Sequence, residues 1–187
     1  MNPKPTLRGA TVAAEWLRDA GVEDAASIES VHSQSREAAY RSHVAQWPPS
    51  GPDRDQRVAR WESWLADPGI HCVVAQQGQE ILGFVTVRGS TDDDLPSTRI
   101  AEMPTLYIAP DHWRRGLGSI LCDVAVERAR SLGFDALVLW VLEINEPARA
   151  FYASLGFEPD GATRIDDGTP EAFEAHRYRL QLSETTE

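Results

Sequence analysis

A turn with two glycines, residues 115–118 (Arg-Gly-Leu-Gly), separates a strand-like apolar segment from an amphipathic one. The amphipathic segment places apolar residues at helical spacing as far as Leu132, and Gly133 follows as a C-terminal cap. A glycine turn that opens a helix presents unpaired backbone N–H groups beside the positive end of the helix dipole, and such donors bind phosphate. The turn alone is a weak signal, but it predicts a strand–loop–helix unit with an anion site.

Hydrophobic periodicity and turn residues predict the other elements, and residues 90–98 are interpreted as an exposed acidic loop. In chain order we expect a strand at 14–18, helices from 22, at 36–47 and at 54–67, a hairpin of 71–76 with 80–87, a strand at 99–110, the helix after the glycine turn, a buried strand at 135–142, a helix at 145–155 and a final pair of strands at 157–164 and 176–182. This order predicts an α/β or α+β fold, with a sheet layered between helices.

Length and composition favour one ordinary domain. The chain has 187 residues, which is enough to bury a core, and we expect residues 1–12 to be a flexible tail before a single domain at 13–183. No apolar run is long enough for a membrane span, and the N-terminus lacks a signal-peptide core, so we expect a cytoplasmic protein. Cys72 and Cys122 lie in apolar stretches and predict neither a disulfide framework nor a metal site.

The charge of the chain bears on its partners. The formal net charge is -11, with 29 acidic against 18 basic residues. This balance argues against nucleic acid, because nucleic-acid binding depends on Lys and Arg at phosphates. A cationic small molecule or a basic peptide is the more natural partner, although acidity that serves solubility alone is an equally good explanation.

Proline interrupts one predicted strand. Pro104 lies in the middle of the segment at 99–110, where it removes a backbone donor and predicts a bulge or an edge. If side chains alternate regularly along this strand, Glu102 shares a face with Pro104, Leu106 and Ile108.

The motifs and their order resemble the GNAT superfamily of acetyl-CoA-dependent N-acetyltransferases over most of the chain, from residue 14 to residue 182. Residues 105–121 (TLYIAPDHWRRGLGSIL) resemble the strand, pyrophosphate loop and helix of that family, and residues 139–161 (LWVLEINEPARAFYASLGFEPDG) resemble its next strand and helix. Residues 31–41 resemble the helices that cover the acceptor. The sequence departs from the family in having Trp113 where Gln or Arg is usual, and in having Pro104 in the acceptor-side strand.

The resemblance implies a mixed, mostly antiparallel twisted sheet that splays at the cofactor site, and acetyl-CoA as co-substrate without a metal. Glycines in the loop let the backbone approach the pyrophosphate, and the arginines add charge-assisted contacts. The residues expected to contact the cofactor are Leu106, Tyr107, Ile108, Trp113, Arg114, Arg115, Gly116, Leu117, Gly118, Ser119, Asn145, Ala148, Phe151 and Tyr152.

Two side chains are the candidate catalytic residues. An amine with a pKa of about 10.4 must lose a proton before it attacks, and Glu102 is the leading candidate base; Glu143 or a chain of waters is the alternative. Tyr152 occupies the usual tyrosine position of the family and can protonate the departing thiolate. Asn145 can bond the pantetheine arm or act as a helix N-cap, and a backbone N–H near Ile108 is expected to meet the oxyanion.

The resemblance implies direct transfer of the acetyl group of acetyl-CoA to a primary amine of a cationic small molecule, and the expected partner is an amine-bearing small molecule or peptide. The alternatives are a protein acetyltransferase acting on Lys or N-terminal amines, and a module that binds acyl-CoA without catalysis. The sequence does not identify the acceptor, and a homodimer is possible.

Overall fold

The computed structural model describes residues 16–43, 52–166 and 172–182, so the predicted tail at 1–12 lies outside the described residues. Its centre is a seven-stranded sheet with the order β1-β2-β3-β4-β5-β7-β6. All neighbouring strands are antiparallel except β4 and β5, which are parallel. The strands are β1 (Leu17–Asp19), β2 (His71–Gln77), β3 (Glu80–Gly89), β4 (Ile100–Ile108), β5 (Ala136–Leu142), β6 (Glu158–Asp166) and β7 (Phe173–Gln181).

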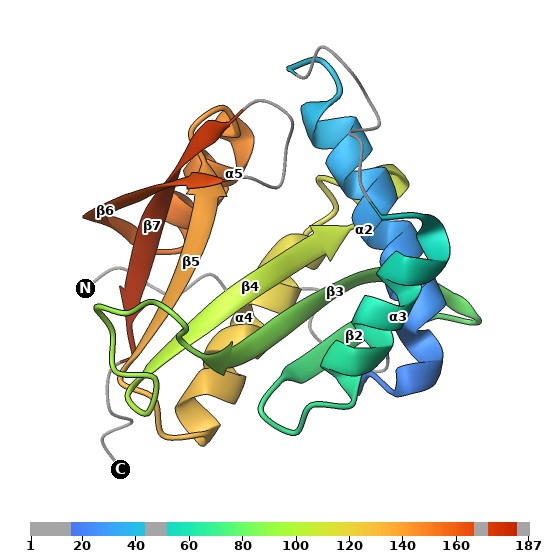
Figure 1. Cartoon of the computed structure of the whole chain (residues 1–187), viewed down its shortest axis with the longest axis horizontal. Coiled ribbons are helices and arrows are strands. Elements are labelled where there is room, and N and C mark those ends of the chain that lie inside the picture. Colours follow the sequence, from blue (N-terminus) through green and yellow to red (C-terminus); the bar gives the residue numbers. More distant parts are fainter. Residues whose placement is uncertain (1–15, 44–51, 167–171, 183–187) are drawn as a thin grey trace.

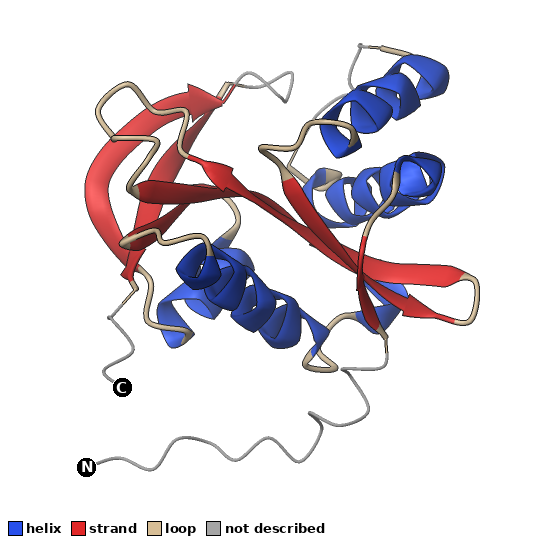
Figure 2. Cartoon of the chain, turned by 90° about the horizontal axis from the view of Figure 1, so that it is seen from below, coloured by secondary structure: helices blue, strands red, loops and turns tan. Residues whose placement is uncertain are grey.

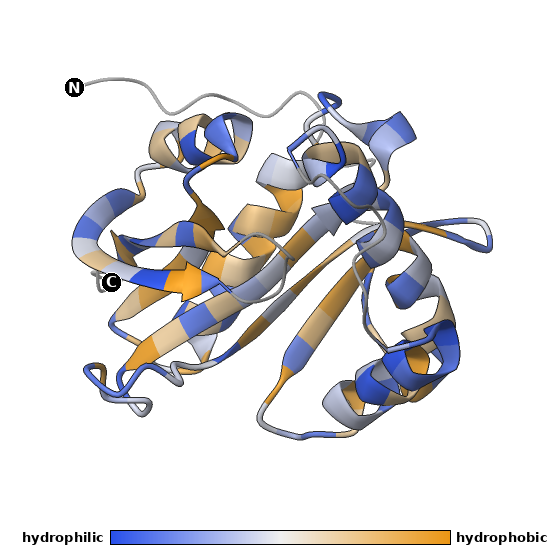
Figure 3. Cartoon of the chain, turned by 45° about the horizontal axis from the view of Figure 1, so that its top comes forward, coloured by the Kyte–Doolittle hydropathy of each residue, from blue (hydrophilic) through white to orange (hydrophobic). Residues whose placement is uncertain are grey.

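Helices cover both faces of the sheet (Figure 2). They are α2 (Ala25–Tyr40), α3 (Arg54–Leu65), α4 (Leu117–Ser131) and α5 (Glu146–Ser154), with short 3-10 helices η1 (Val22–Asp24) and η2 (Pro110–His112). The apolar stripes of α4 and α5 pack on one face in the larger core, and those of α2 and α3 pack on the other face in a second core. Figure 3 shows the apolar residues gathered on the strands and on the helix sides that meet them.

Two of the predicted helices are a single helix. We expected one helix from residue 22 and another at 36–47, but α2 runs without a break from Ala25 to Tyr40, and residues 44–47 lie outside the described part. The polar residues between the two predicted helices contain no Gly or Pro, so nothing in that stretch interrupts the backbone. One of them, Ser35, is buried and faces the sheet.

Strands β4 and β5 pair over a short distance only and then separate. Their register joins Ile100, Ala101 and Glu102 to residues 136–138, and no pair follows beyond Glu102. In Figure 1 the two arrows start side by side and diverge toward their heads. The expected splay is therefore present, and its apex is at Glu102.

A bulge in β4 lies directly after this apex. Thr86 pairs with Thr105 and Arg88 pairs with Glu102, so β4 carries one extra residue opposite Val87 and the predicted irregularity at Pro104 is confirmed. The extra residue shifts the alternation of side chains by one position. The expectation that Glu102 shares a face with Leu106 and Ile108 was therefore wrong. Ile108 belongs to the core under α4, as does the partly buried Leu106, whereas Glu102 contacts residues of the opposite face.

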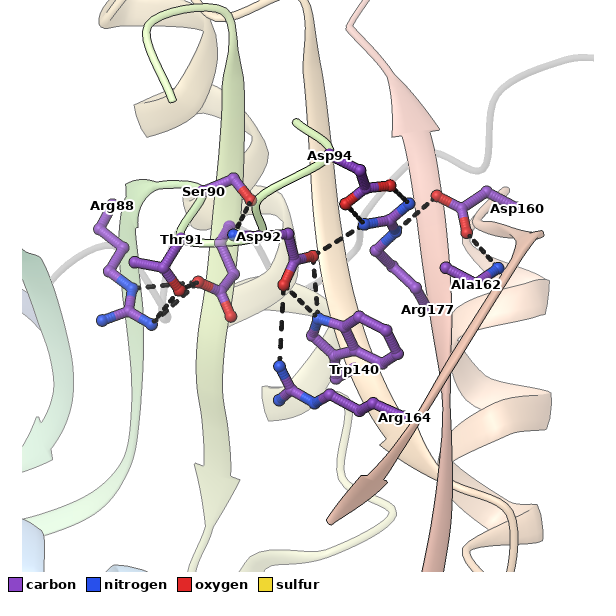
Figure 4. A network of polar contacts seen from close by, with 11 residues as sticks. Arg88, Ser90, Thr91, Asp92, Asp94, Trp140, Asp160, Ala162, Arg164 and Arg177 are labelled. Atoms are coloured by element: carbon purple, nitrogen blue, oxygen red, sulfur yellow. Dashed lines mark hydrogen bonds and ion pairs between the residues drawn. The ribbon is translucent and has the colours of Figure 1, made fainter. Parts of the chain in front are cut away.

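The acidic segment is exposed along most of its length, as its composition predicts, but it is also tied to the sheet. We call residues 90–99 the strap, because they cross the sheet face opposite α4 and are tied to β7 (Figure 4). Arg177, which is 5% exposed, contacts Asp92 at 2.9 Å and Asp94 at 2.6 Å, and it also contacts Asp160 at 2.7 Å. Ion pairing, which composition does not reveal, fixes the strap.

Within the described ranges, none of the helices combines the length and apolar character that crossing a membrane requires.

Candidate active site

The glycine turn adopts an uncommon backbone conformation at the N-terminus of α4. Arg114 has φ 60° and Gly116 has φ 85°, both in the left-handed region. A Cβ at Gly116 would meet no atom within 4 Å, so the backbone conformation and not crowding requires glycine there. Backbone that alternates into the left-handed region turns its N–H groups into a concave anion site. The exposed Arg114 and Arg115 add positive charge beside it.

Gly118 lies where the first turn of α4 meets α5. A Cβ at this position would lie 3.4 Å from Cζ of Phe151, an ordinary van der Waals contact, so packing does not by itself require glycine there. Phe151 and Tyr152 pack against the larger core together, with ring centroids 5.1 Å apart. Leu117 is buried in the same core, so its side chain anchors the helix, whereas the neighbouring Ser119 is only half-buried.

Backbone donors of β4 line the gap between β4 and β5. Ala109 N donates to Leu82 O, which places the donors of alternate residues Thr105 and Tyr107 toward β3. The N–H groups of Leu106 and Ile108 therefore face the gap, where β5 no longer pairs. The nitrogen of Pro104 faces away from β3, as those of Leu106 and Ile108 do, so its missing N–H removes no hydrogen bond between β3 and β4.

The carbonyl of Ile108 is held from two sides. It accepts a hydrogen bond from Ser35 Oγ of α2 and one from Trp113 Nε1, each at 2.6 Å. Trp113 thus ties the glycine turn to the end of β4. This contact gives a structural reason for tryptophan at the position where Gln or Arg was expected.

Tyr152 packs against the larger core on the α4 side of the sheet. Its ring packs against Phe157 at 5.8 Å, and the described residues provide no hydrogen-bond partner for its hydroxyl. Burial first, and then the nearby Cys122 thiol, raises the pKa of Tyr152 above that of a free phenol. The hydroxyl therefore remains protonated. Burial also raises the pKa of the Cys122 thiol to about 12, so the cysteine is neutral and has no nucleophilic character.

Glu102 lies on the opposite face of the sheet and is 3% exposed. Its Oε2 accepts hydrogen bonds from Arg88 Nε at 3.1 Å, from Arg88 Nη2 at 2.9 Å and from Thr91 Oγ1 at 3.3 Å. The predicted base and the predicted acid thus belong to opposite faces of the sheet. Glu143, the alternative carboxylate, follows β5 and is exposed.

Asn145 caps α5 and also connects the two sides of the gap. Its Oδ1 accepts from Ala148 N at 3.2 Å, and its Nδ2 donates to the hydroxyl of Tyr40 at 2.9 Å. The cap interpretation is confirmed. One amide hydrogen of Asn145 is left for another acceptor.

Tyr107 and Tyr40 belong to the side covered by α2. The half-buried ring of Tyr107 packs edge-on against His32, with centroids 4.7 Å apart, so its side chain faces the helices expected to cover the acceptor. Tyr40, Arg88 and His32 were not among the predicted site residues. Each is held on this face of the sheet by contacts distant in sequence, so no local motif could have indicated them.

A family model described as the acetyltransferase (GNAT) family matches residues 36–157, which include the strand, the glycine turn and the Tyr152 helix. The chain belongs to the GNAT acetyltransferase family. The resemblance seen in the sequence is therefore confirmed.

Curated relatives of this GNAT chain are longer proteins. A mycothiol acetyltransferase of Rhodococcus jostii is 32% identical over 140 residues, which are 74% of this chain and 43% of that protein. An N-acetyltransferase of Methanocaldococcus jannaschii is 32% identical over 108 residues, 56% of this chain and 47% of that protein. The chain thus spans less than half the length of these relatives.

Solved structures of GNAT proteins have the same fold. A ribosomal-protein-alanine N-acetyltransferase of Brucella melitensis superposes with a TM-score of 0.70 at 20% identity, covering 89% of this chain and 99% of that one. An acetyltransferase of Salmonella typhimurium, solved with its cofactor acetyl-CoA, gives 0.67 at 23% identity and covers 91% and 95%. These superpositions establish the fold, and at such low sequence identity they do not identify the acceptor.

Proposed function

We propose that this protein transfers the acetyl group of acetyl-CoA directly to a primary amine in the gap between β4 and β5. The observation that carries the proposal is the arrangement around this gap. Inward-facing donors of Leu106 and Ile108 line one edge, Tyr152 packs on the α4 face, and Glu102 belongs to the other face. A thioester held between the strands would meet an acid on one side and a base on the other.

The glycine turn is proposed to hold the pyrophosphate. The left-handed Arg114 and Gly116 and the first turn of α4 supply backbone donors, and the open space at Gly116 leaves room for an anion. Asn145 keeps one amide hydrogen for the pantetheine arm. Bound acetyl-CoA supplies an activated acetyl group, whose carbonyl oxygen the N–H groups of Leu106 and Ile108 would stabilise as charge develops.

Glu102 is proposed to accept the amine proton, and Tyr152 to donate a proton to the thiolate. The N–C bond forms as the C–S bond breaks, so one proton leaves the amine and another reaches the sulfur. Holding amine and thioester in line can lower the barrier by roughly 7–11 kcal/mol. Since the Cys122 thiol is neutral, transfer without an acyl-enzyme agrees better with this site.

The acceptor is proposed to be a small molecule, and a cationic one. The name of the relatives, mycothiol acetyltransferase, supports a small-molecule acceptor, and the net charge of -11 supports a cationic one.

A panel of amines tests the proposal. Spermidine, a lysine peptide, a peptide with a free N-terminal alanine and the acceptor of mycothiol acetyltransferases would each be incubated with acetyl-CoA, and free thiol would be measured. Transfer above the rate of acetyl-CoA hydrolysis is expected for at least one small amine. Mass shifts on the peptides alone would indicate a protein acetyltransferase, and binding of acetyl-CoA without thiol release would contradict catalysis.

A further inference from the structure

The carboxylate of Glu102 is held on one oxygen only. All three hydrogen bonds that it accepts, two from Arg88 and one from Thr91, end on Oε2. The described residues give Oε1 no hydrogen bond, although Glu102 is almost completely buried. Oε1 is also not among the buried atoms that lack a partner, so it keeps some contact with solvent.

This geometry differs from a bidentate ion pair. Arginine frequently contacts a carboxylate with two parallel hydrogen bonds, one to each oxygen. Here Nε and Nη2 of Arg88 converge on the same oxygen. The arrangement immobilises the carboxylate and leaves its second oxygen available as an acceptor.

Besides Glu102, Arg88 contacts Trp64 of α3 and Thr91 of the strap. Its guanidinium lies 5.2 Å from the ring centroid of Trp64 on α3, and its Nη2 donates to Thr91 Oγ1 of the strap at 3.2 Å. Figure 4 shows Arg88 beside the strap residues Ser90 and Thr91. Its side chain is 23% exposed, so solvent screens the pair only in part. Arg88 thus connects the helix and the strap on the acceptor side to the proposed base.

We propose that Arg88 is a positioning residue, which anchors Oε2 of Glu102 so that Oε1 receives the proton of the acceptor amine. This inference rests on the proposed function. When the amine attacks, its proton passes to Oε1, the N–C bond forms, and the thiolate that leaves takes the proton of Tyr152. Arg88 gives up no proton and acts only through Glu102.

A double-mutant cycle in turnover tests this role. Wild type, Arg88→Met, Glu102→Gln and the double variant would be assayed with the panel amine acetylated fastest by wild type. We expect Arg88→Met to lower kcat about tenfold to a hundredfold with an unchanged KM for acetyl-CoA, and to have almost no effect once Glu102 is Gln. A structural role would lower kcat equally in both backgrounds, and that result would overturn the inference.

Two further variants keep the test decisive if Arg88→Met folds poorly. Arg88→Lys retains the charge but not the two converging donors, so kcat should recover only in part. Thr91→Val removes the third donor without changing charge and should lower kcat a few-fold, again only when Glu102 is present. Arg128→Met is the matched control, because Arg128 pairs with the exposed Asp19 at 2.6 Å, and its kcat should equal that of wild type.

The outcomes separate this inference from the proposed function. If wild type transfers no acetyl group to any amine of the panel, the proposed function fails. If wild type is active and depends on Glu102 while Arg88→Met and Arg88→Lys retain full kcat, the inference about Arg88 fails alone.

Discussion

The two sides of the β4–β5 gap are built in different ways. On the α4 side, the features that could hold acetyl-CoA are backbone groups and small residues close in sequence, from Trp113 to Gly118, together with one adjoining helix. On the strap side, the corresponding features are charged side chains far apart in the chain. Arg177 meets the strap across 85 residues at Asp92 and across 83 at Asp94.

The difference separates a backbone site that tolerates side-chain changes from a side-chain network that does not. A backbone site depends on φ angles and on a helix N-terminus, so it tolerates changes of side chain such as Trp113. A side-chain network depends on every partner, since a buried ion that loses its partner is costly. We infer that the α4 side serves the common co-substrate and that the strap side adapts to one acceptor.

The largest effect is expected from Tyr152, the proposed acid on the α4 side. Tyr152→Phe removes one oxygen and keeps the ring that packs on Phe157, so turnover should fall roughly 10²- to 10⁴-fold while Tm barely moves. Because burial raises the pKa of Tyr152, the variant should show this deficit at every pH up to 9. Steady-state kinetics with a substrate for which chemistry limits the rate would measure it.

Phe151→Ala is the matched control at the adjacent position. Phe151 is partly buried and packs against the core, so truncating it should cost less than the about 3–5 kcal/mol of a fully buried phenylalanine; Tm should fall while the folded protein retains its kcat at saturating acetyl-CoA. Near-normal turnover in Tyr152→Phe would leave Tyr152 as a packing residue, and the two sides of the gap would no longer divide acid from base.

On the strap side, Arg177→Met should destabilise the fold. It leaves the mostly buried Asp92 and Asp160 without the partner that they share with the exposed Asp94, and removing one member of a buried ion pair costs about 3–5 kcal/mol. Chemical denaturation would measure the loss. Arg164→Met is the control, because Arg164 is 47% exposed and lies 3.8 Å from Asp92, so its stability should stay within about 1 kcal/mol of wild type. Equal losses in both variants would refute the distinction between a buried anchor and a surface pair.

Lowering the pH should reduce the free energy of unfolding, because it protonates Glu29 of α2. Burial pushes the pKa of Glu29 up, but the His32 ring, 3.6 Å away, and hydrogen bonds from Ser33 and Arg57 outweigh it and lower the pKa to about 2. An unfolded glutamate has a pKa of about 4.3, so this contribution, about 3 kcal/mol, is complete above that pH and is lost as pH falls toward 2. Urea unfolding between pH 6 and 3 should therefore be less pH-dependent in Glu29→Gln, whereas the exposed Glu62→Gln should behave like wild type.

Local patterns predicted most of the strands, the glycine turn and the α5 cap, because each depends on residues close together in the chain, whereas the mixed, splayed sheet was expected from the family resemblance. The strap and the partner of Glu102 could not be predicted, since Arg88, Asp92 and Arg177 have no motif in common and meet only when β3, β4 and β7 are assembled. The bulge was predicted from Pro104, but its effect on the side-chain alternation was not. A single extra residue moved Leu106 and Ile108 to the face opposite Glu102.

Valine substitutions at the two ends of α4 should distinguish a cofactor-binding glycine from one that only caps the helix, with an effect of moderate size. Gly116 and Gly133 flank α4, with φ 85° and 82°, and a Cβ at either would meet no atom within 4 Å. Gly→Val at each position should therefore cause similar strain. Only Gly116→Val should abolish the stabilisation by acetyl-CoA, about 2.7 kcal/mol at a ligand concentration 100 times Kd. Thermal shifts with and without acetyl-CoA would show this, and a retained shift in Gly116→Val would remove the turn from the cofactor site.

The smallest effect concerns charge on the strap side. Around the strap the carboxylates of Asp92, Asp94, Asp160 and Glu102 are largely balanced by the guanidiniums of Arg88, Arg164 and Arg177. A cationic acceptor would therefore be attracted by the field of the whole molecule, with its net charge of -11, more than by the strap itself. Salt screens such a field over about 8 Å at physiological ionic strength.

We expect kcat/KM for spermidine to fall a few-fold between about 0.05 and 0.5 M salt, and kcat/KM for a neutral amine to stay constant. Asp94→Asn should leave the salt dependence unchanged, because Asp94 is already paired with Arg177. A preferred acceptor that is neutral, with a rate constant indifferent to salt, would show that the acidity of the chain has no role in recognition.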